Sequence, residues 1–141
     1  MTIDSSEVSG QLTKRPRRLR TTERLRALVR ESRVSAEQLV MPHFVLPTDR
    51  AEDPVESMPG ISRYGVKNLA ERVLADADLG IRAVLLFGTP EDGKKNERGT
   101  PASSPSSAVA RAVETLKQRA GDEIVVITDV CLCAYTSHGH C

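Results

Sequence analysis

Three cysteines lie within the last eleven residues of this 141-residue chain: Cys131, Cys133 and Cys141. An odd number of cysteines spaced this closely is not typical of a disulfide framework. The first twenty residues contain no apolar segment of the kind that a secretory signal has, so we expect the protein to be cytoplasmic, where thiols stay reduced. Under those conditions the cysteine cluster favours metal binding or thiol chemistry.

The residues that lead into the cysteines form an apolar run over residues 123–132, which is typical of a β-strand. Because side chains alternate between the two faces of a strand, Asp129, Cys131 and Cys133 are expected to point the same way at its carboxyl end. A turn then returns Cys141 toward them. Three soft thiolate sulfurs suit Zn²⁺ and leave one tetrahedral position open, as in catalytic zinc sites.

The spacing alone leaves alternatives open. His138 or His140 could fill the fourth position and close a structural zinc site. The two strand cysteines could instead be buried core thiols and the last one incidental, because C-x-C-x7-C is less specific than paired C-x-x-C knuckles. Asp129 is either an acid that caps the end of the strand or a catalytic acid beside the metal.

The segments that must position these residues alternate between strand and helix. Apolar runs predict strands over residues 38–46, 81–88 and 123–132, the second of them buried on both faces. Helical periodicity and capping residues predict helices over 22–33, over 68–78, and between Ser107 and Gly121. This alternation predicts an α/β class with a parallel sheet and helical crossovers.

Three further features belong to the first half of the chain. Pro42 indicates an edge position or a strand end for the first strand. His43 is most simply a packed strand histidine. Between residues 47 and 65, several prolines and glycines predict a long loop.

The charge is unevenly distributed. Residues 14–33 hold nine of the 20 lysines and arginines and two acidic residues, a local charge of +7, whereas the rest of the chain carries −6. The four aromatic residues lie outside this segment, which argues against a base-stacking nucleic-acid surface. No apolar run is long enough to cross a membrane. We favour protein–protein contact for the basic segment, with a plain solvated segment as the alternative.

The cysteine segment also resembles a known family. DVCLCAYTSHGHC (residues 129–141) is similar to the zinc-binding segment of the delta-aminolevulinic acid dehydratases, also called porphobilinogen synthases. Collinear matches upstream support the resemblance: RPRRLR (15–20), LVMPHFV (39–45), SMPGISRYGV (57–66), LGIRAVLLFG (79–88) and KNERGT (95–100).

The resemblance implies the N-terminal part of a TIM (β/α)8 barrel, about three βα units, preceded by an extended and helical N-terminal arm. Together with composition it divides the chain into a disordered N-terminus (1–13), a basic arm with a short helix (14–36) and a partial barrel truncated after its third strand (37–141). The arm is expected to embrace a neighbouring subunit of a homo-octamer. A complete barrel needs about 200 residues or more.

The resemblance also implies a hydro-lyase reaction, in which two 5-aminolevulinate molecules condense with loss of two waters to give porphobilinogen for heme and other tetrapyrroles. Cys131, Cys133 and Cys141 match the family's zinc ligands, and Asp129 matches its active-site aspartate. The zinc acts there as a Lewis acid on the second substrate molecule, while the aspartate orients the metal-bound group or assists proton transfer. The resemblance also allows Mg²⁺ elsewhere in the assembly.

The family forms Schiff bases through two lysines on later strands, and no segment of this sequence matches them. The chain's own lysines lie in polar arm, loop or helix contexts that do not suit a desolvated nucleophile: Lys14, Lys67, Lys94, Lys95 and Lys117. We therefore expect the chain alone to be inactive. The competing hypothesis is a non-catalytic zinc module, closed by a histidine, whose basic arm binds an acidic partner.

Overall fold

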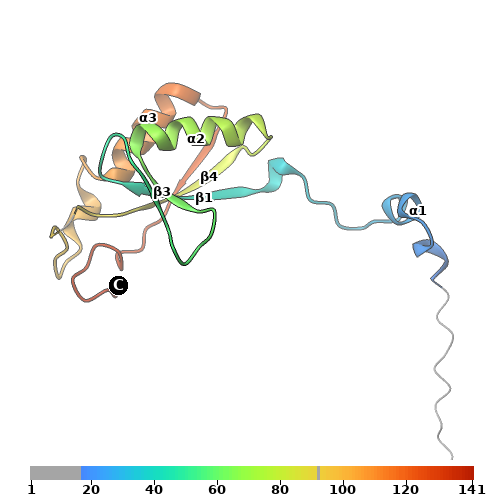
Figure 1. Cartoon of the computed structure of the whole chain (residues 1–141), viewed down its shortest axis with the longest axis horizontal. Coiled ribbons are helices and arrows are strands. Elements are labelled where there is room, and N and C mark those ends of the chain that lie inside the picture. Colours follow the sequence, from blue (N-terminus) through green and yellow to red (C-terminus); the bar gives the residue numbers. More distant parts are fainter. Residues whose placement is uncertain (1–16, 92) are drawn as a thin grey trace, which may run out of the picture. The chain divides into compact units, whose positions relative to one another are not determined.

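The computed structural model describes residues 17–91 and 93–141, so the disorder expected for residues 1–13 lies outside the described residues. The chain divides into two compact units. The first ends at Arg33, and the second runs from Val34 to Cys141. Figure 1 labels the main helices and strands of both units.

The first unit contains a 3₁₀ turn, η1 (Arg18–Arg20), and a short helix, α1 (Glu23–Leu28). Thr22 caps this helix, since its hydroxyl accepts a hydrogen bond from the Leu25 amide at 3.1 Å. Our prediction that the helix continues to residue 33 was wrong. No residue of α1 is buried, so its narrow apolar stripe gains no packing energy that would extend it.

The second unit is built on a five-stranded sheet with the strand order β2-β3-β1-β4-β5. The predicted parallel arrangement is confirmed for β1 (Val40–Leu46), β4 (Ala83–Gly88) and β5 (Val125–Thr128). The other two strands, β2 (Glu52–Pro54) and β3 (Ser62–Gly65), pair antiparallel, and β3 runs parallel to β1.

The β2–β3 hairpin corrects the expectation of a loop over residues 47–65. Its strands are three and four residues long, too short for an alternating pattern to register in the sequence. Arg63 pairs with Asp53 at 2.6 Å across the hairpin, and the Gly65 amide donates to the Ala51 carbonyl at 2.8 Å. Backbone pairing and one ion pair therefore define these strands, and hydrophobic periodicity does not.

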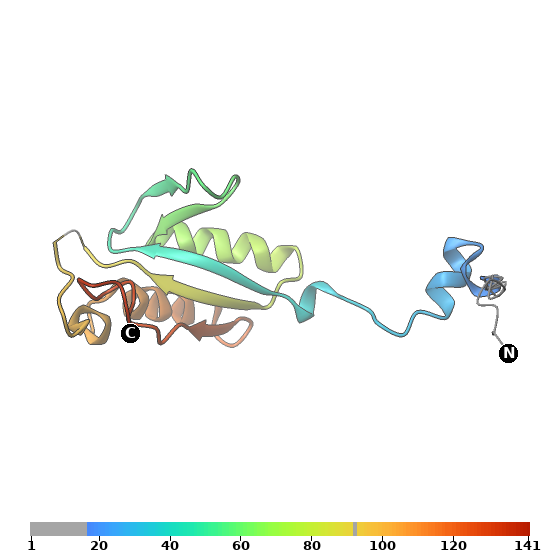
Figure 2. The same ribbon diagram turned by 90° about the horizontal axis from the view of Figure 1, so that it is seen from below.

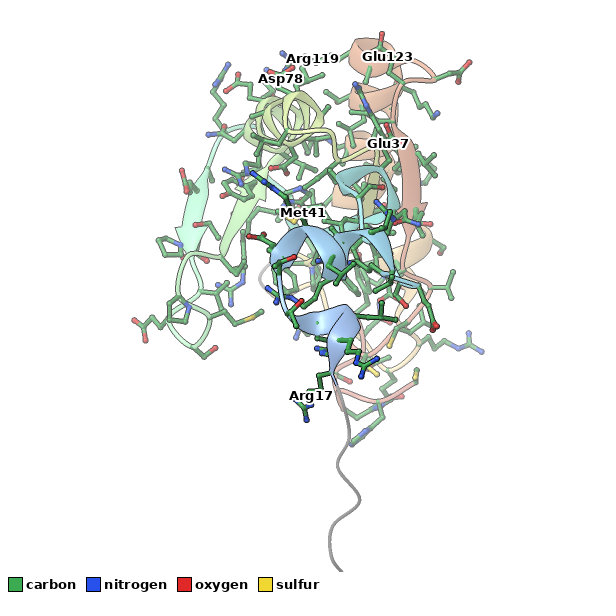
Figure 3. The ribbon with its side chains drawn as sticks, turned by 90° about the vertical axis from the view of Figure 1, so that its right-hand side faces the viewer. Arg17, Glu37, Met41, Asp78, Arg119 and Glu123 are labelled. Carbon is green, nitrogen blue, oxygen red and sulfur yellow. The ribbon has the colours of Figure 1, made fainter. Side chains whose placement is uncertain are left out.

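Both long helices of the second unit lie on the same side of the sheet (Figure 1). They are α2 (Val66–Asp78) and α3 (Ala108–Ala120), and Asp78 and Arg119 mark their C-terminal ends in Figure 3. The predicted cap of α3 is confirmed, because the Ser107 hydroxyl accepts from the Ala110 amide at 3.3 Å. The helices and the sheet share one core: Val45, Val66, Leu69, Ala70, Val73, Ala77, Val84, Leu86, Ala108, Ala112, Leu116 and Ile124.

The opposite face of the sheet is uncovered in the described part of the chain. We predicted that β4 would be buried on both faces, but only Val84 and Leu86, which face the helices, are buried. On the other face Leu85 and Phe87 are half-buried, and Ile127, which pairs with Leu85, is 39% exposed. A strand that is apolar on both sides thus has a helix layer on one side only.

β1 lies in the middle of the strand order, but the edge position predicted for Pro42 is confirmed locally. Its pairing with β3 covers Phe44 to Leu46, so at Pro42 it pairs with β4 alone. This one-sided pairing accommodates a residue without an amide hydrogen. His43 is a buried strand histidine, as expected, and its Nε2 lies 3.0 Å from Oδ2 of Asp76 on α2. Across the described segments, no helix is both long and apolar enough to span a membrane.

Candidate metal centre

The cysteine segment begins where β5 ends. β5 stops at Thr128, so the prediction of a strand through residue 132 was wrong. The Asp129 amide still donates to the Leu86 carbonyl at 3.2 Å, but the Asp129 carboxylate then accepts from the Cys131 amide at 3.2 Å and turns the chain away from the sheet. This side-chain to backbone bond competes with the sheet ladder, as short acidic side chains often do.

The three cysteines converge although they do not share a strand face. Their sulfur atoms all lie within 4.8 Å of one another, and the Cys131 and Cys141 sulfurs are 3.9 Å apart. Two sulfurs bound tetrahedrally to one zinc ion at about 2.3 Å each lie about 3.8 Å apart, so the cluster needs little adjustment to hold one ion. The cysteines are free, with Cys131 and Cys133 half-buried and Cys141 exposed.

The electrostatics of the cluster also suit a cation. Hydrogen bonds from the amide and thiol of Cys133 hold the pKa of Cys131 below its ordinary value. The bonds to Cys131 and then to Cys141 raise the pKa of Cys133 to about 11. The Cys133 thiol therefore stays protonated at neutral pH unless a positive charge lies beside it. A bound metal ion supplies that charge and stabilises the thiolates.

Two residues between the cysteines close the segment on itself. The Thr136 hydroxyl lies 2.9 Å from the His140 carbonyl oxygen and 3.4 Å from that of Cys133, which brings the chain next to Cys141 back toward Cys133. Tyr135 is buried against Gly88 at the end of β4. Sequence reasoning missed both residues. The signal available in the sequence was that Tyr135 is the only Phe, Tyr or Trp between Cys131 and Cys141.

The two histidines do not join the sulfur cluster among the described residues. The Nε2 atom of His138 lies 3.2 Å from the Glu97 carbonyl oxygen, and its Nδ1 accepts from the His140 amide at 3.3 Å. The rings of the two histidines stack on each other at 6.2 Å between centroids. Among the described residues, the cluster that could hold a metal ion therefore contains three sulfurs and no imidazole.

The chain has similar counterparts among known proteins. A family model described as delta-aminolevulinic acid dehydratase matches residues 13–141. The chain belongs to this family. Among delta-aminolevulinic acid dehydratases, that of Synechocystis sp. is 43% identical over 129 residues, and that of Streptomyces coelicolor is 36% identical over 127 residues.

Those alignments cover 92% and 90% of this chain and 38% of each relative, so the chain spans little more than a third of these delta-aminolevulinic acid dehydratases. A crystal structure of the Toxoplasma gondii ME49 enzyme in complex with its reaction product, porphobilinogen, superposes with a TM-score of 0.81 at 33% identity. The match covers 87% of this chain and 34% of that one. The chain therefore has an α/β fold that matches part of the family's TIM barrel.

Proposed function

We propose that this chain supplies the zinc-binding part of a porphobilinogen synthase, which condenses two 5-aminolevulinate molecules to porphobilinogen with loss of two waters. The observation that carries the proposal is the convergence of three sulfurs within 4.8 Å at the carboxyl end of a parallel strand, on a chain of this family. Barrels of this class place their chemistry at that end of the strands.

In the proposed site, Cys131, Cys133 and Cys141 hold Zn²⁺. When bound, the ion supplies Lewis-acid polarisation to a carbonyl or amine of the substrate. Asp129 holds the Cys131 amide with its Oδ1 atom, which fixes the carboxylate two residues from the first ligand. We assign the other oxygen, Oδ2, to orienting the substrate or moving a proton to and from it.

The covalent half of the reaction has no candidate among the described lysines. Lys67 pairs with Asp49 at 2.9 Å, and Lys117 lies 3.2 Å from the Gly121 carbonyl oxygen. Both are about half exposed, and a lysine nucleophile needs a desolvated environment to lower its pKa. We therefore propose that residues 1–141 carry the metal chemistry and not the Schiff-base chemistry.

The resemblance extends the proposal to assembly and compartment. The basic arm over residues 14–36 would contact a second copy of the chain, as in a homo-octamer, and the reduced thiols suit the cytoplasm. Exposed apolar side chains on the arm are consistent with such a contact, since Leu19 is 57% and Leu28 77% exposed. The resemblance alone suggests that a second metal, Mg²⁺, binds elsewhere in the assembly.

Cobalt substitution tests the proposal against a closed zinc module. The reduced chain should bind one equivalent of Co²⁺ with the charge-transfer absorption of three thiolates, and 5-aminolevulinate should change the cobalt spectrum by occupying the open position. Levulinate, which lacks the amine, is the matched control ligand. A spectrum that ignores 5-aminolevulinate and contains an imidazole ligand would favour the closed module. A chain that binds no zinc with its thiols reduced would overturn both functions.

A further inference from the structure

The loop that joins β4 to α3 binds the cysteine segment through backbone hydrogen bonds. In Figures 1 and 2 this loop lies beside the C-terminal segment at the same end of the sheet. The contact is a parallel bridge between Asn96 and Thr136. The Asn96 amide donates to the Tyr135 carbonyl at 3.3 Å, and the Ser137 amide donates to the Asn96 carbonyl at 3.1 Å. Asn96 thus binds the chain on both sides of Thr136.

The side chain of Asn96 builds the loop that presents this backbone. Its Oδ1 accepts from the amides of Arg98 at 3.1 Å and Thr100 at 3.2 Å, and its Nδ2 donates to the Thr100 hydroxyl at 2.7 Å. The side chain therefore fixes the loop, while the main chain of the same residue binds the cysteine segment. An alanine here would lose all three side-chain bonds.

Two further observations place this loop close to the segment. Gly99 has φ +62°, and a Cβ atom there would lie 3.4 Å from side-chain atoms of Leu132 and of Thr136. The Glu97 carbonyl oxygen lies 3.2 Å from the His138 ring. The loop over residues 96–100 thus contacts the chain between the second and third cysteines and lies close to Leu132, between the first two.

We propose that Asn96 is a positioning residue for the metal site: it preorganises the segment that carries the three sulfurs from a loop some forty residues away, without contacting the metal. The inference rests on the proposed function, since it concerns the same sulfurs. Ligands that are already ordered bind a metal more tightly, because the entropy of ordering them is not lost on binding. Residues that support metal ligands typically contribute about 10–100-fold to affinity.

The test compares zinc affinity across variants of the 1–141 chain, measured by competition with a chromophoric chelator. Asn96→Ala should weaken zinc binding about 10–100-fold. Asn96→Asp should stay within about threefold of the unaltered chain, because its carboxylate keeps both amide bonds and can accept the Thr100 hydroxyl proton. Glu97→Ala is the matched control from the same loop, where only the backbone makes contact, and it should leave affinity unchanged.

The possible results separate this inference from the proposed function. If Asn96→Ala binds zinc as tightly as the unaltered chain, the positioning role is wrong while the zinc site stands. If the unaltered chain itself binds no zinc, the proposed function fails first. Should Asn96→Ala lose its helical circular dichroism, Asn96→Gln answers the same question. In this variant the side-chain carbonyl is displaced by one methylene, so the chain should fold but bind zinc as weakly as predicted for Asn96→Ala. Unchanged zinc affinity of Asn96→Gln would overturn the inference.

Discussion

Tyr135 rests on Gly88. A Cβ atom at Gly88 would overlap the hydroxyl oxygen of Tyr135 and the Cγ2 atom of Val109, so the end of β4 can hold the aromatic ring only where a side chain is absent. Because Tyr135 lies between the second and third cysteines, this contact ties the sulfur cluster to the sheet.

Gly88→Ala should displace Tyr135 and loosen the cluster. We expect a cost of about 1–3 kcal/mol from overpacking and a loss of zinc affinity of about tenfold. Chelator competition and circular dichroism measure the two effects. Tyr135→Phe removes the overlapping oxygen, so the double variant should recover part of the affinity. Unchanged zinc binding in Gly88→Ala would show that the ring does not anchor the sulfurs.

Each cysteine should be required for zinc binding. Replacing Cys133 by serine leaves two thiolates and a half-buried hydroxyl, and we expect zinc affinity to fall at least about a hundredfold. His140→Ala serves as the comparison, because neither histidine belongs to the described sulfur cluster. Metal analysis after gel filtration gives the stoichiometry. Loss of zinc from His140→Ala equal to that from Cys133→Ser would instead indicate a site closed by imidazole.

His43 should titrate below its ordinary pKa of 6.5. Burial lowers the pKa of His43, and the Asp76 carboxylate opposes this shift while Arg72 adds to it. The folded chain therefore keeps the ring neutral while the unfolded chain binds a proton as the pH falls below about 6.5, so folding stability is lost progressively from that pH downward. The histidine Cε1 proton resonance in an NMR titration reports the pKa directly.

The sign of that effect can be checked with two variants. Asp76→Asn removes the carboxylate that raises the pKa of His43, so the pKa should fall further. His43→Gln should flatten the loss of helical signal between pH 7 and pH 5. A His43 resonance that gives a pKa at or above 6.5 would show that burial does not outweigh the Asp76 carboxylate in setting the pKa of His43.

The chain alone should not form porphobilinogen, and it should unfold over a broad range of temperature. No described lysine lies in a desolvated setting, and β5 presents an unpaired edge to solvent within the described sheet. A colorimetric assay for porphobilinogen with added zinc and thiol measures the first expectation. Calorimetry measures the second, and a sharp reversible transition would refute it.

The helices α2 and α3 could be predicted closely from sequence, because the apolar spacing of both helices and the caps of α3 at Ser107 and Gly121 are local signals. The hairpin strands β2 and β3 could not, since each is too short to show a period. The burial of β4 was overestimated because sequence reports which side chains are apolar and not which face meets a partner.

The sulfur cluster could be predicted from the cysteine spacing, but its geometry could not. The strand prediction placed Cys131 and Cys133 on one face, whereas the Asp129–Cys131 hydrogen bond ends the strand first and a turn brings the sulfurs together. Asn96 and Thr136 are forty residues apart in the sequence, and no local pattern in either segment predicts their contact. Long-range backbone pairing of this kind is decided by the whole fold.

The face of the sheet that no described helix covers has a practical consequence for handling the protein. Phe44 and Phe87 pack there in a tilted arrangement at 5.8 Å between ring centroids, on the same face as Leu85 and the exposed Ile127, while α2 and α3 lie on the reverse side. The second unit therefore exposes an apolar sheet face on one side and polar helix surfaces on the other. In purification we expect the protein to adsorb to plastic and to air–water interfaces. A mild detergent and a low protein concentration should keep it from aggregating.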